Sequence, residues 1–257
     1  MCELFGISSR KTIIANDLLS MFFLHSQEHP HGWGLAVFRG HAVTLEKEPV
    51  RASFSTYLEH RLTCNIEADN LLAHIRKATV GEMTYSNCHP FVWDDDSGRT
   101  WTLIHNGTVF EPHLISPFFS RQEGTTDSEG VLLYLIDRIN RRAAAEGRPL
   151  SHAERFQEIN EGVTALAECG KLNLILYDGE QMYVHSNYRG YLHYSREEDS
   201  CCFSTLPLLK RRWEPLPLNR VFGYIAGELV HQGAPHPYEH LDSRHDMSLI
   251  YGAYASL

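Results

Sequence analysis

A cysteine stands at position 2, directly after the initiator methionine. Methionine aminopeptidases remove Met1 when the second residue is small, so the mature chain is expected to begin with a residue that carries both a thiol and a free α-amine. An α-amino group titrates at about 7.7 to 8.0, so it can take the thiol proton at working pH. The alternative is an ordinary small core cysteine. The position of Cys2 thus predicts a nucleophile with its own base.

Two further segments carry groups that could hold the two ends of an amino acid. Arg76 and Thr79 follow a predicted strand together, and an arginine can grip a carboxylate through two parallel hydrogen bonds. A surface salt bridge is the alternative for Arg76. Asp127 lies in the first turn of a predicted helix, where a carboxylate either complements the helix dipole or faces a ligand ammonium. The sequence leaves these alternatives open.

Asn106 and Gly107 offer two hydrogen-bond donors, a side-chain amide and a backbone N–H, to a developing oxyanion. Taken alone, the dipeptide is more typical of a plain turn. In residues 31–36, Gly32 and a second glycine flank Trp33, which allows close approach of a backbone beside a large apolar wall. We expect Gly32 and Trp33 to contribute to substrate binding.

Together these groups describe one kind of substrate. A guanidinium suits an α-carboxylate, a carboxylate suits an α-ammonium, two donors suit a carbonyl oxygen, and a thiol attacks the carbonyl carbon. L-Glutamine, or another γ-glutamyl amide, carries all of these features. We therefore expect a small-molecule substrate of this class.

The overall composition indicates which partners, location and cofactors to expect for this protein. The 257 residues are 43% hydrophobic, enough for a packed core, and the formal charge of −9 argues against nucleic acid or an anionic membrane as a partner. There is no membrane-length apolar stretch and no signal peptide, so a soluble, cytoplasmic protein is expected. The 16 histidines and six cysteines form no CxxC, HExxH or Cys/His quartet, so we expect reduced thiols, no metal and no cofactor.

Alternating apolar residues predict strands in both outer parts of the chain, and a 3.6-residue period predicts helices in the middle. The first part is expected to hold strands at 3–8, 33–38, 42–48, 71–76 and 101–105 and a helix at 15–26. A capping box from Thr126 to Glu129 begins one long helix, and a second helix follows at about 156–166. Further strands are predicted at 172–177, 182–185, 191–194, 201–205 and 221–229.

This order of strands, helices and strands, without regular βαβ alternation, predicts an α+β sandwich of antiparallel sheets and not a doubly wound fold. No internal repeat or low-complexity tract divides the sequence, so a single domain is expected over residues 1–257. Adjacent Cys201 and Cys202 are expected to point to opposite faces of one strand.

In the order of its motifs, the chain resembles the class II glutamine amidotransferases, which are N-terminal nucleophile (Ntn) hydrolases. Members combine an N-terminal cysteine with the segments HxRxAT-x-G, HNG and S/T-D-x-E. Here these are Cys2 and residues 74–81, 105–107 and 126–129. The resemblance implies a four-layer αββα sandwich and the stand-alone, YafJ-like branch of the family.

The resemblance also implies a role for each candidate residue. Cys2 would be the nucleophile and, through its amine, the base. Asn106 and Gly107 would form the oxyanion hole. Arg76 and Thr79 would hold the substrate carboxylate, and Asp127 would bind its amino group.

The expected activity is an amidohydrolase that cleaves the γ-amide through a γ-glutamyl thioester and releases glutamate. Glutamine as the substrate would imply a partner protein that consumes ammonia, whereas a larger γ-glutamyl amide needs none. The alternative is a catalytically silent subunit or sensor that binds a γ-glutamyl ligand and retains Met1. A homodimer is compatible with the sequence, which identifies no interface.

Overall fold

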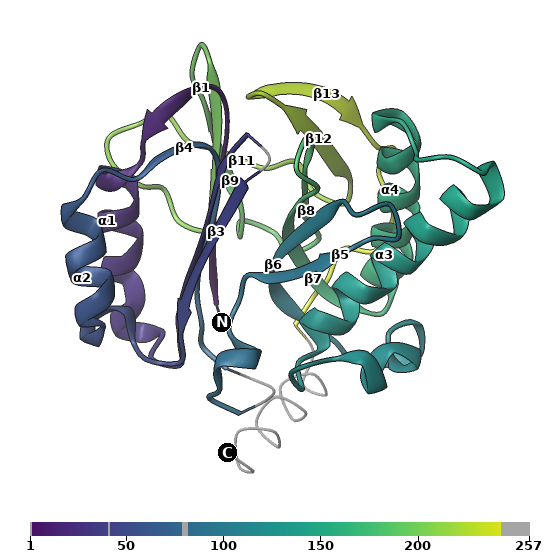
Figure 1. Cartoon of the computed structure of the whole chain (residues 1–257), viewed down its shortest axis with the longest axis horizontal. Helices are drawn as coiled ribbons and strands as arrows, with labels where there is room; N and C mark the ends of the chain where they lie inside the picture. The colour runs from purple at the N-terminus through teal and green to yellow at the C-terminus, as the bar shows by residue number, and fades with distance from the viewer. Residues whose placement is uncertain (1, 41, 79–81, 243–257) are drawn as a thin grey trace.

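The structure is a computed structural model that describes residues 2–40, 42–78 and 82–242. Two antiparallel sheets face each other, and a pair of helices covers the outer side of each (Figure 1). Helices α1 (Asn16–Leu24) and α2 (Thr56–Thr63) cover one sheet, and α3 (Asp127–Glu146) and α4 (His152–Glu168) cover the other. The expected α+β fold, a four-layer αββα sandwich, is therefore confirmed.

The sheet beneath α1 and α2 has seven strands in the order β11-β9-β10-β1-β4-β2-β3. Their bounds are β1 (Glu3–Ile14), β2 (Trp33–Arg39), β3 (Ala42–Glu48), β4 (Glu67–Ile75), β9 (His193–Arg196), β10 (Ser200–Ser204) and β11 (Glu214–Pro215). In register, Ile75 of β4 lies opposite both Glu3 of β1 and Trp33 of β2. The residues that precede β1 and β2 and the residue that follows β4 therefore meet at one end of this sheet.

The sheet beneath α3 and α4 has six strands in the order β13-β12-β8-β7-β6-β5. Their bounds are β5 (Phe91–Asp94), β6 (Thr100–Val109), β7 (Gly170–Tyr177), β8 (Met182–Ser186), β12 (Val221–Ile225) and β13 (Glu228–Gln232). Short 3₁₀ turns occur at His25–Glu28, Ala52–Phe54, Tyr85–Asn87, Pro112–Leu114 and Ser116–Arg121. The chain passes from one sheet to the other between β4 and β5, so the two sheets are joined near the end of β4.

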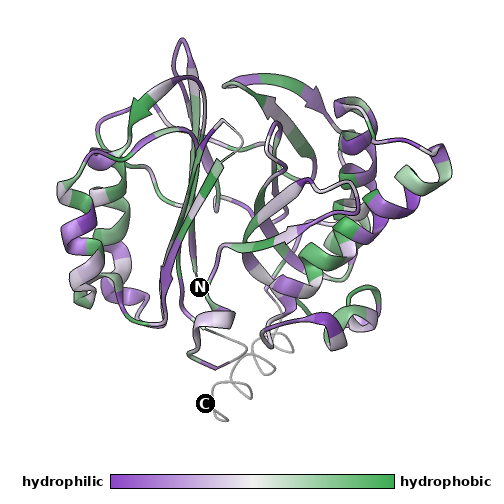
Figure 2. Ribbon diagram, in the orientation of Figure 1, coloured by the Kyte–Doolittle hydropathy of each residue, from purple (hydrophilic) through white to green (hydrophobic). Residues whose placement is uncertain are grey.

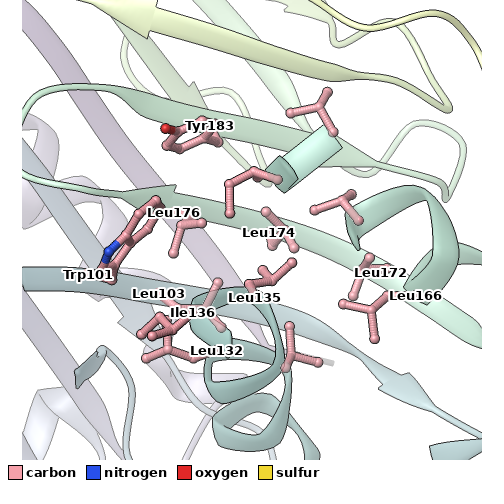
Figure 3. Packing of buried hydrophobic residues seen from close by; sticks show 14 of the residues in the cluster. Trp101, Leu103, Leu132, Leu135, Ile136, Leu166, Leu172, Leu174, Leu176 and Tyr183 are labelled. Carbon is pink, nitrogen blue, oxygen red and sulfur yellow. The ribbon is translucent and has the colours of Figure 1, made fainter. Parts of the chain in front are cut away.

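Apolar side chains fill the three spaces between the four layers. Beneath α3 and α4, apolar residues spaced three or four apart in α3 meet alternate residues of β6 and β7 (Figure 3): Leu132, Leu135, Ile136, Leu103, Leu172, Leu174 and Leu176. Full burial of one such side chain is worth about 1.5–3 kcal/mol. The outward faces of the helices are largely hydrophilic (Figure 2), so each helix is amphipathic and is oriented by the sheet that it covers.

Most predicted elements are present, with shifted ends. The two predicted hairpins are confirmed as β2–β3 and β7–β8. The single strand predicted at 221–229 is wrong, because the chain reverses at Ala226 and Gly227, both at positive φ (49° and 78°), and forms the paired strands β12 and β13. The strand predicted at 191–194 begins only at His193, so Tyr191 lies in the preceding turn. Helix α2 was not predicted; the Ser55 hydroxyl caps it by accepting the Leu58 N–H.

The capping box predicted at the start of α3 is wrong. The helix begins at Asp127 as expected, but within the described part of the chain the Thr126 hydroxyl makes no capping hydrogen bond. The Glu129 carboxylate instead accepts the backbone N–H groups of Glu123 and Gly124, both at 2.8 Å, so it holds the preceding loop. A complete capping box is present at the start of α4, between Ser151 and Glu154.

The two adjacent cysteines of β10 point to opposite faces of the sheet, as predicted. Cys201 lies in the core between the sheets, whereas Cys202 lies in the core beneath α1 and α2. All six cysteines are free thiols.

Candidate active site

Cys2 directly precedes β1, and it contacts both Lys77, which follows β4 of the same sheet, and Asn106 of β6 in the other sheet. Its Sγ accepts the backbone N–H of Lys77 at 3.3 Å and lies 3.6 Å from the Lys77 carbonyl oxygen. Its own carbonyl oxygen accepts hydrogen bonds from Asn106 Nδ2 and from the Tyr191 hydroxyl. Both the thiol and the backbone of Cys2 are thus held by neighbouring elements.

The surroundings of Cys2 favour a neutral thiol. Burial raises the pKa of this thiol, and the backbone N–H of Lys77 and the charge of Arg76 only partly oppose that effect. The Asp127 carboxylate acts in the same direction as burial. A thiol in this setting needs a base to become a nucleophile at neutral pH.

Arg76 follows β4 directly and is 2% exposed. Its Nη1 donates to the Glu82 carbonyl oxygen at 2.9 Å, and its backbone N–H donates to the Gly32 carbonyl oxygen at 2.8 Å. Burial raises the pKa of the Cys2 thiol and lowers that of His31; the charge of Arg76 opposes the first shift and adds to the second. A buried guanidinium is therefore part of the same site as Cys2. Thr79, predicted to act with Arg76, lies outside the described residues.

Asn106 and Gly107 belong to β6 and pair with Asn173 and Leu172 of β7, so the Asn-Gly step is in a strand and not in a turn. A Cβ atom on Gly107 would lie only 1.8 Å from the Lys171 carbonyl oxygen, so glycine alone fits this position. The Asn106 side chain reaches across to Cys2 of the other sheet. The amide predicted as an oxyanion donor therefore lies beside the predicted nucleophile.

Asp127 is the first residue of α3, in the first turn as predicted, and is half-buried. One of its carboxylate oxygens accepts the Val109 N–H at 2.9 Å, which ties the start of the helix to the end of β6. Its charge also reaches Cys2 and His105. The carboxylate thus has a structural bond and at the same time contributes negative charge to the site.

The predicted pair Gly32 and Trp33 divides between two environments. Gly32 lies at the site next to Arg76, at φ 142°, and a Cβ atom there would lie 2.7 Å from Cys88 Sγ. Trp33 is 1% exposed and packs in the core beneath α1 and α2 against Phe23. Because the Trp33 side chain points to the helical side of the sheet, the structure does not bring it together with Cys2. Its contact with substrate stays a prediction.

Three contributors to the site were not predicted from the sequence. The backbone of Lys77 binds Cys2 Sγ, the Tyr191 hydroxyl binds the Cys2 carbonyl, and His31 Nδ1 accepts the Ala78 N–H at 2.9 Å. His31 is the first residue of the glycine-flanked segment 31–36, so that segment could have been used to predict it. Lys77 contacts Cys2 through its backbone, so its side-chain type gives no signal. Tyr191 reaches Cys2 because of the path of the turn before β9, which its residue type does not indicate.

The sequence matches the model of a known family. The model of the "Glutamine amidotransferases class-II" matches residues 1–211. An uncharacterized protein of Methanocaldococcus jannaschii is 32% identical over 192 residues, which are 74% of this chain and 52% of that protein. YafJ of Escherichia coli, a suggested glutamine amidotransferase, is 29% identical over 194 residues, which are 72% of each chain.

Solved structures share the fold. A predicted glutamine amidotransferase of Pseudomonas aeruginosa superposes with a TM-score of 0.64 at 21% identity, covering 90% of this chain and all of that one. The glutamine phosphoribosylpyrophosphate amidotransferase of Bacillus subtilis gives a TM-score of 0.66 at 16% identity, covering 89% of this chain and 48% of that one. At this identity the likeness concerns the fold alone.

The chain therefore belongs to the class-II glutamine amidotransferases, within which it is similar to the YafJ-like members. It spans about half the length of two curated relatives, 52% of the M. jannaschii protein and 54% of a suggested glutamine amidotransferase of Haemophilus influenzae that is 32% identical. In residues 2–40, 42–78 and 82–242, no three His, Cys, Asp or Glu side chains are arranged to hold a metal ion. No helix of this part is long and apolar enough to cross a membrane.

Proposed function

We propose that this chain hydrolyses the γ-amide of glutamine or of a larger γ-glutamyl amide, with Cys2 as the nucleophile after removal of Met1. One observation carries the proposal: the Asn106 amide from one sheet and the Lys77 N–H from the other both contact Cys2. The expected oxyanion donor thus contacts the backbone of Cys2, and the segment of the expected carboxylate clamp contacts its thiol.

In the proposed reaction, the α-amine of processed Cys2 accepts the thiol proton and Sγ attacks the amide carbon. As the C–S bond forms, the carbonyl oxygen becomes an oxyanion that accepts hydrogen bonds from Asn106 Nδ2 and the Gly107 N–H. The α-ammonium then gives its proton to the leaving nitrogen as the C–N bond breaks. Water cleaves the γ-glutamyl thioester, releases glutamate and restores the thiol and the amine.

Charge at the site supports the choice of substrate. The buried Arg76 guanidinium suits an α-carboxylate, and Thr79 completes this clamp in the proposal. The half-buried Asp127 carboxylate at the start of α3 suits an α-ammonium. A free γ-glutamyl group carries both charges at one end and the scissile amide at the other. If the amide is that of glutamine, the released ammonia implies a partner protein that uses it.

The test is hydrolysis of glutamine and of a panel of γ-glutamyl amides by the purified chain. Cys2→Ala is expected to abolish turnover, because no thiol remains to form the thioester, and to leave the melting temperature nearly unchanged. Cys64→Ala is the control, since Cys64 is an exposed free thiol, and it should retain full activity. An active Cys2→Ala variant would contradict the proposal.

One observation favours a second candidate, a binding subunit or sensor that retains Met1. Burial raises the pKa of the Cys2 thiol. In an unprocessed chain the amine of Cys2 is acylated and cannot serve as the base, so the thiol would stay protonated and the site would only bind. This candidate predicts glutamine or glutamate binding by calorimetry without any turnover.

A further inference from the structure

We propose that Tyr191 is a positioning residue that holds the carbonyl of Cys2, so that one N–H of Asn106 can turn to the reacting amide. The inference rests on the proposed function and adds a residue to it. Tyr191 lies in the turn before β9, directly after Gly190 at φ 70°, and is 9% exposed. Its hydroxyl thereby reaches the space between the two sheets at Cys2.

Three polar groups meet at this point. Asn106 Nδ2 donates to the Cys2 carbonyl oxygen and to the Tyr191 hydroxyl oxygen, and the Tyr191 hydroxyl donates to the same Cys2 carbonyl. A side-chain amide nitrogen has only two hydrogens, so both are engaged by these contacts. Asn106 can bind an oxyanion only by giving one of them up.

The Tyr191 hydroxyl provides a hydrogen bond to the Cys2 carbonyl that does not depend on Asn106. When one Asn106 N–H turns to the substrate, the Cys2 carbonyl keeps the Tyr191 donor and stays hydrogen-bonded. A held carbonyl fixes the plane of the peptide that follows Cys2, and with it the directions of the amine and thiol on the same Cα. Tyr191 therefore acts on the reaction through Cys2 and Asn106 and does not need to touch the substrate.

The direction of the Tyr191 proton follows from the partners of its hydroxyl. The phenolic oxygen accepts from Asn106 Nδ2, so its single hydrogen is left for the Cys2 carbonyl oxygen. Burial raises the pKa of Tyr191 well above its ordinary value, so the phenol keeps this hydrogen at working pH.

The Tyr191 ring packs near Lys171 of β7 and near Tyr188, which lies in the same connection between β8 and β9. The Lys171 ammonium lies 3.2 Å from the centre of the Tyr188 ring and 5.6 Å from that of Tyr191, and the two rings are 5.9 Å apart. The carbonyl oxygen of Lys171 is also the atom that would lie nearest a Cβ on Gly107. The strand that shapes the Asn106-Gly107 step therefore also supports Tyr191.

The experiment compares Tyr191→Phe with Tyr183→Phe. The control also removes a buried tyrosine hydroxyl, one that donates to Asp178 at 2.8 Å in the core beneath α3 and α4. Both variants keep the ring, so both should fold with a similar small loss of thermal stability. We measure kcat and KM for the best γ-glutamyl amide, and the rate at which a diazoketone analogue of glutamine labels Cys2, by peptide mass spectrometry.

Tyr191→Phe is expected to lower kcat about tenfold, which equals about 1.4 kcal/mol, while KM changes less than about twofold because Arg76 and Asp127 are untouched. Tyr183→Phe should leave both constants within about twofold of the starting values. In an Asn106→Ala background the Tyr191 effect should shrink to about twofold or less, because the donor it frees is gone. An unchanged kcat in Tyr191→Phe, or a full tenfold loss on the Asn106→Ala background, would overturn the inference.

The labelling rate separates this inference from the proposed function. If the unaltered chain does not hydrolyse any amide but is labelled at Cys2, hydrolysis is refuted while Tyr191 is still tested. Labelling about tenfold slower in Tyr191→Phe than in Tyr183→Phe then supports the positioning role. Equal labelling of the two variants, or no labelling of the unaltered chain, overturns it.

Discussion

Individual residues of the site are constrained by very close packing between strands. Gly107 shows this most clearly, because a Cβ atom there would lie 1.8 Å from the Lys171 carbonyl oxygen and 2.6 Å from His105 Nε2. Backbone atoms of a paired strand cannot move aside without breaking the ladder of hydrogen bonds between β6 and β7. The requirement for glycine next to Asn106 therefore has a steric cause that is independent of any role of the Gly107 N–H in catalysis.

This requirement gives a prediction for Gly107→Ala. The variant should lose more than about 2 kcal/mol of unfolding free energy, because the clash involves backbone and not a flexible side chain. Gly98→Ala is the control, since a Cβ atom there meets nothing within 4 Å, although the residue lies at φ 78°. Urea unfolding followed by circular dichroism measures both. A loss below about 1 kcal/mol in Gly107→Ala would contradict the steric requirement.

At the scale of elements, helices α3 and α4 begin with different hydrogen-bond arrangements. Helix α4 begins with a reciprocal capping box in which Ser151 accepts the Glu154 N–H and Glu154 accepts the Ser151 N–H. Helix α3, which carries Asp127 to the site, instead begins with the Asp127 carboxylate bound to the Val109 N–H. The start of α3 is therefore fixed to β6, the strand that carries Asn106.

The contrast predicts different costs for two similar substitutions. Ser151→Ala should lower the unfolding free energy by about 0.5–2 kcal/mol and leave kcat unchanged, because the Ser151 hydroxyl bonds Glu154 within the same helix. Thr126→Val should cost less, since it keeps the buried side-chain volume and the Thr126 hydroxyl makes no capping hydrogen bond in the described part of the chain. Thermal unfolding of the two variants in parallel decides the point. Equal losses would mean that Thr126 does cap α3.

For the molecule as a whole, stability should depend on a buried lysine near the site. Burial lowers the pKa of Lys171 from 10.5 to about 8, although Asp242 partly opposes this. Between about pH 8 and pH 10.5 the unfolded chain therefore binds more protons at this residue than the folded chain does. Protonated Lys171 disfavours the fold below this window, and its contribution improves as the pH rises through it.

Lys171→Met tests this dependence. The unfolding free energy of the unaltered chain should rise, relative to the variant, between about pH 8 and pH 10.5, because only the unaltered chain has a buried ammonium that loses its charge in this range. Lys210→Met is the control, as Lys210 is exposed, and it should follow the unaltered chain across the same range. Urea unfolding at several pH values supplies the free energies. A constant difference between Lys171→Met and the unaltered chain would contradict the assignment.

Much of the architecture could be predicted from the sequence, because periodicity indicates an α+β sandwich of antiparallel sheets and the resemblance carried by the motifs implies its four αββα layers. Cys2, Arg76, Asn106 and Asp127, far apart in the chain, do lie together, and their roles remain proposals. The errors arose where long-range contacts decide local structure. Glu129 binds loop amides instead of completing a capping box, and Tyr191 reaches Cys2 only through a turn whose path depends on both sheets.

The central claim is that processed Cys2 carries a γ-glutamyl group during turnover, and mass spectrometry tests it most directly. The chain is mixed with the best γ-glutamyl amide, quenched in acid within one turnover, and analysed intact and as peptides. We predict a chain that begins at Cys2 and bears a γ-glutamyl thioester on the N-terminal peptide, absent from Cys2→Ala. Hydrolysis by a chain that retains Met1, or turnover without any adduct on Cys2, would contradict the account.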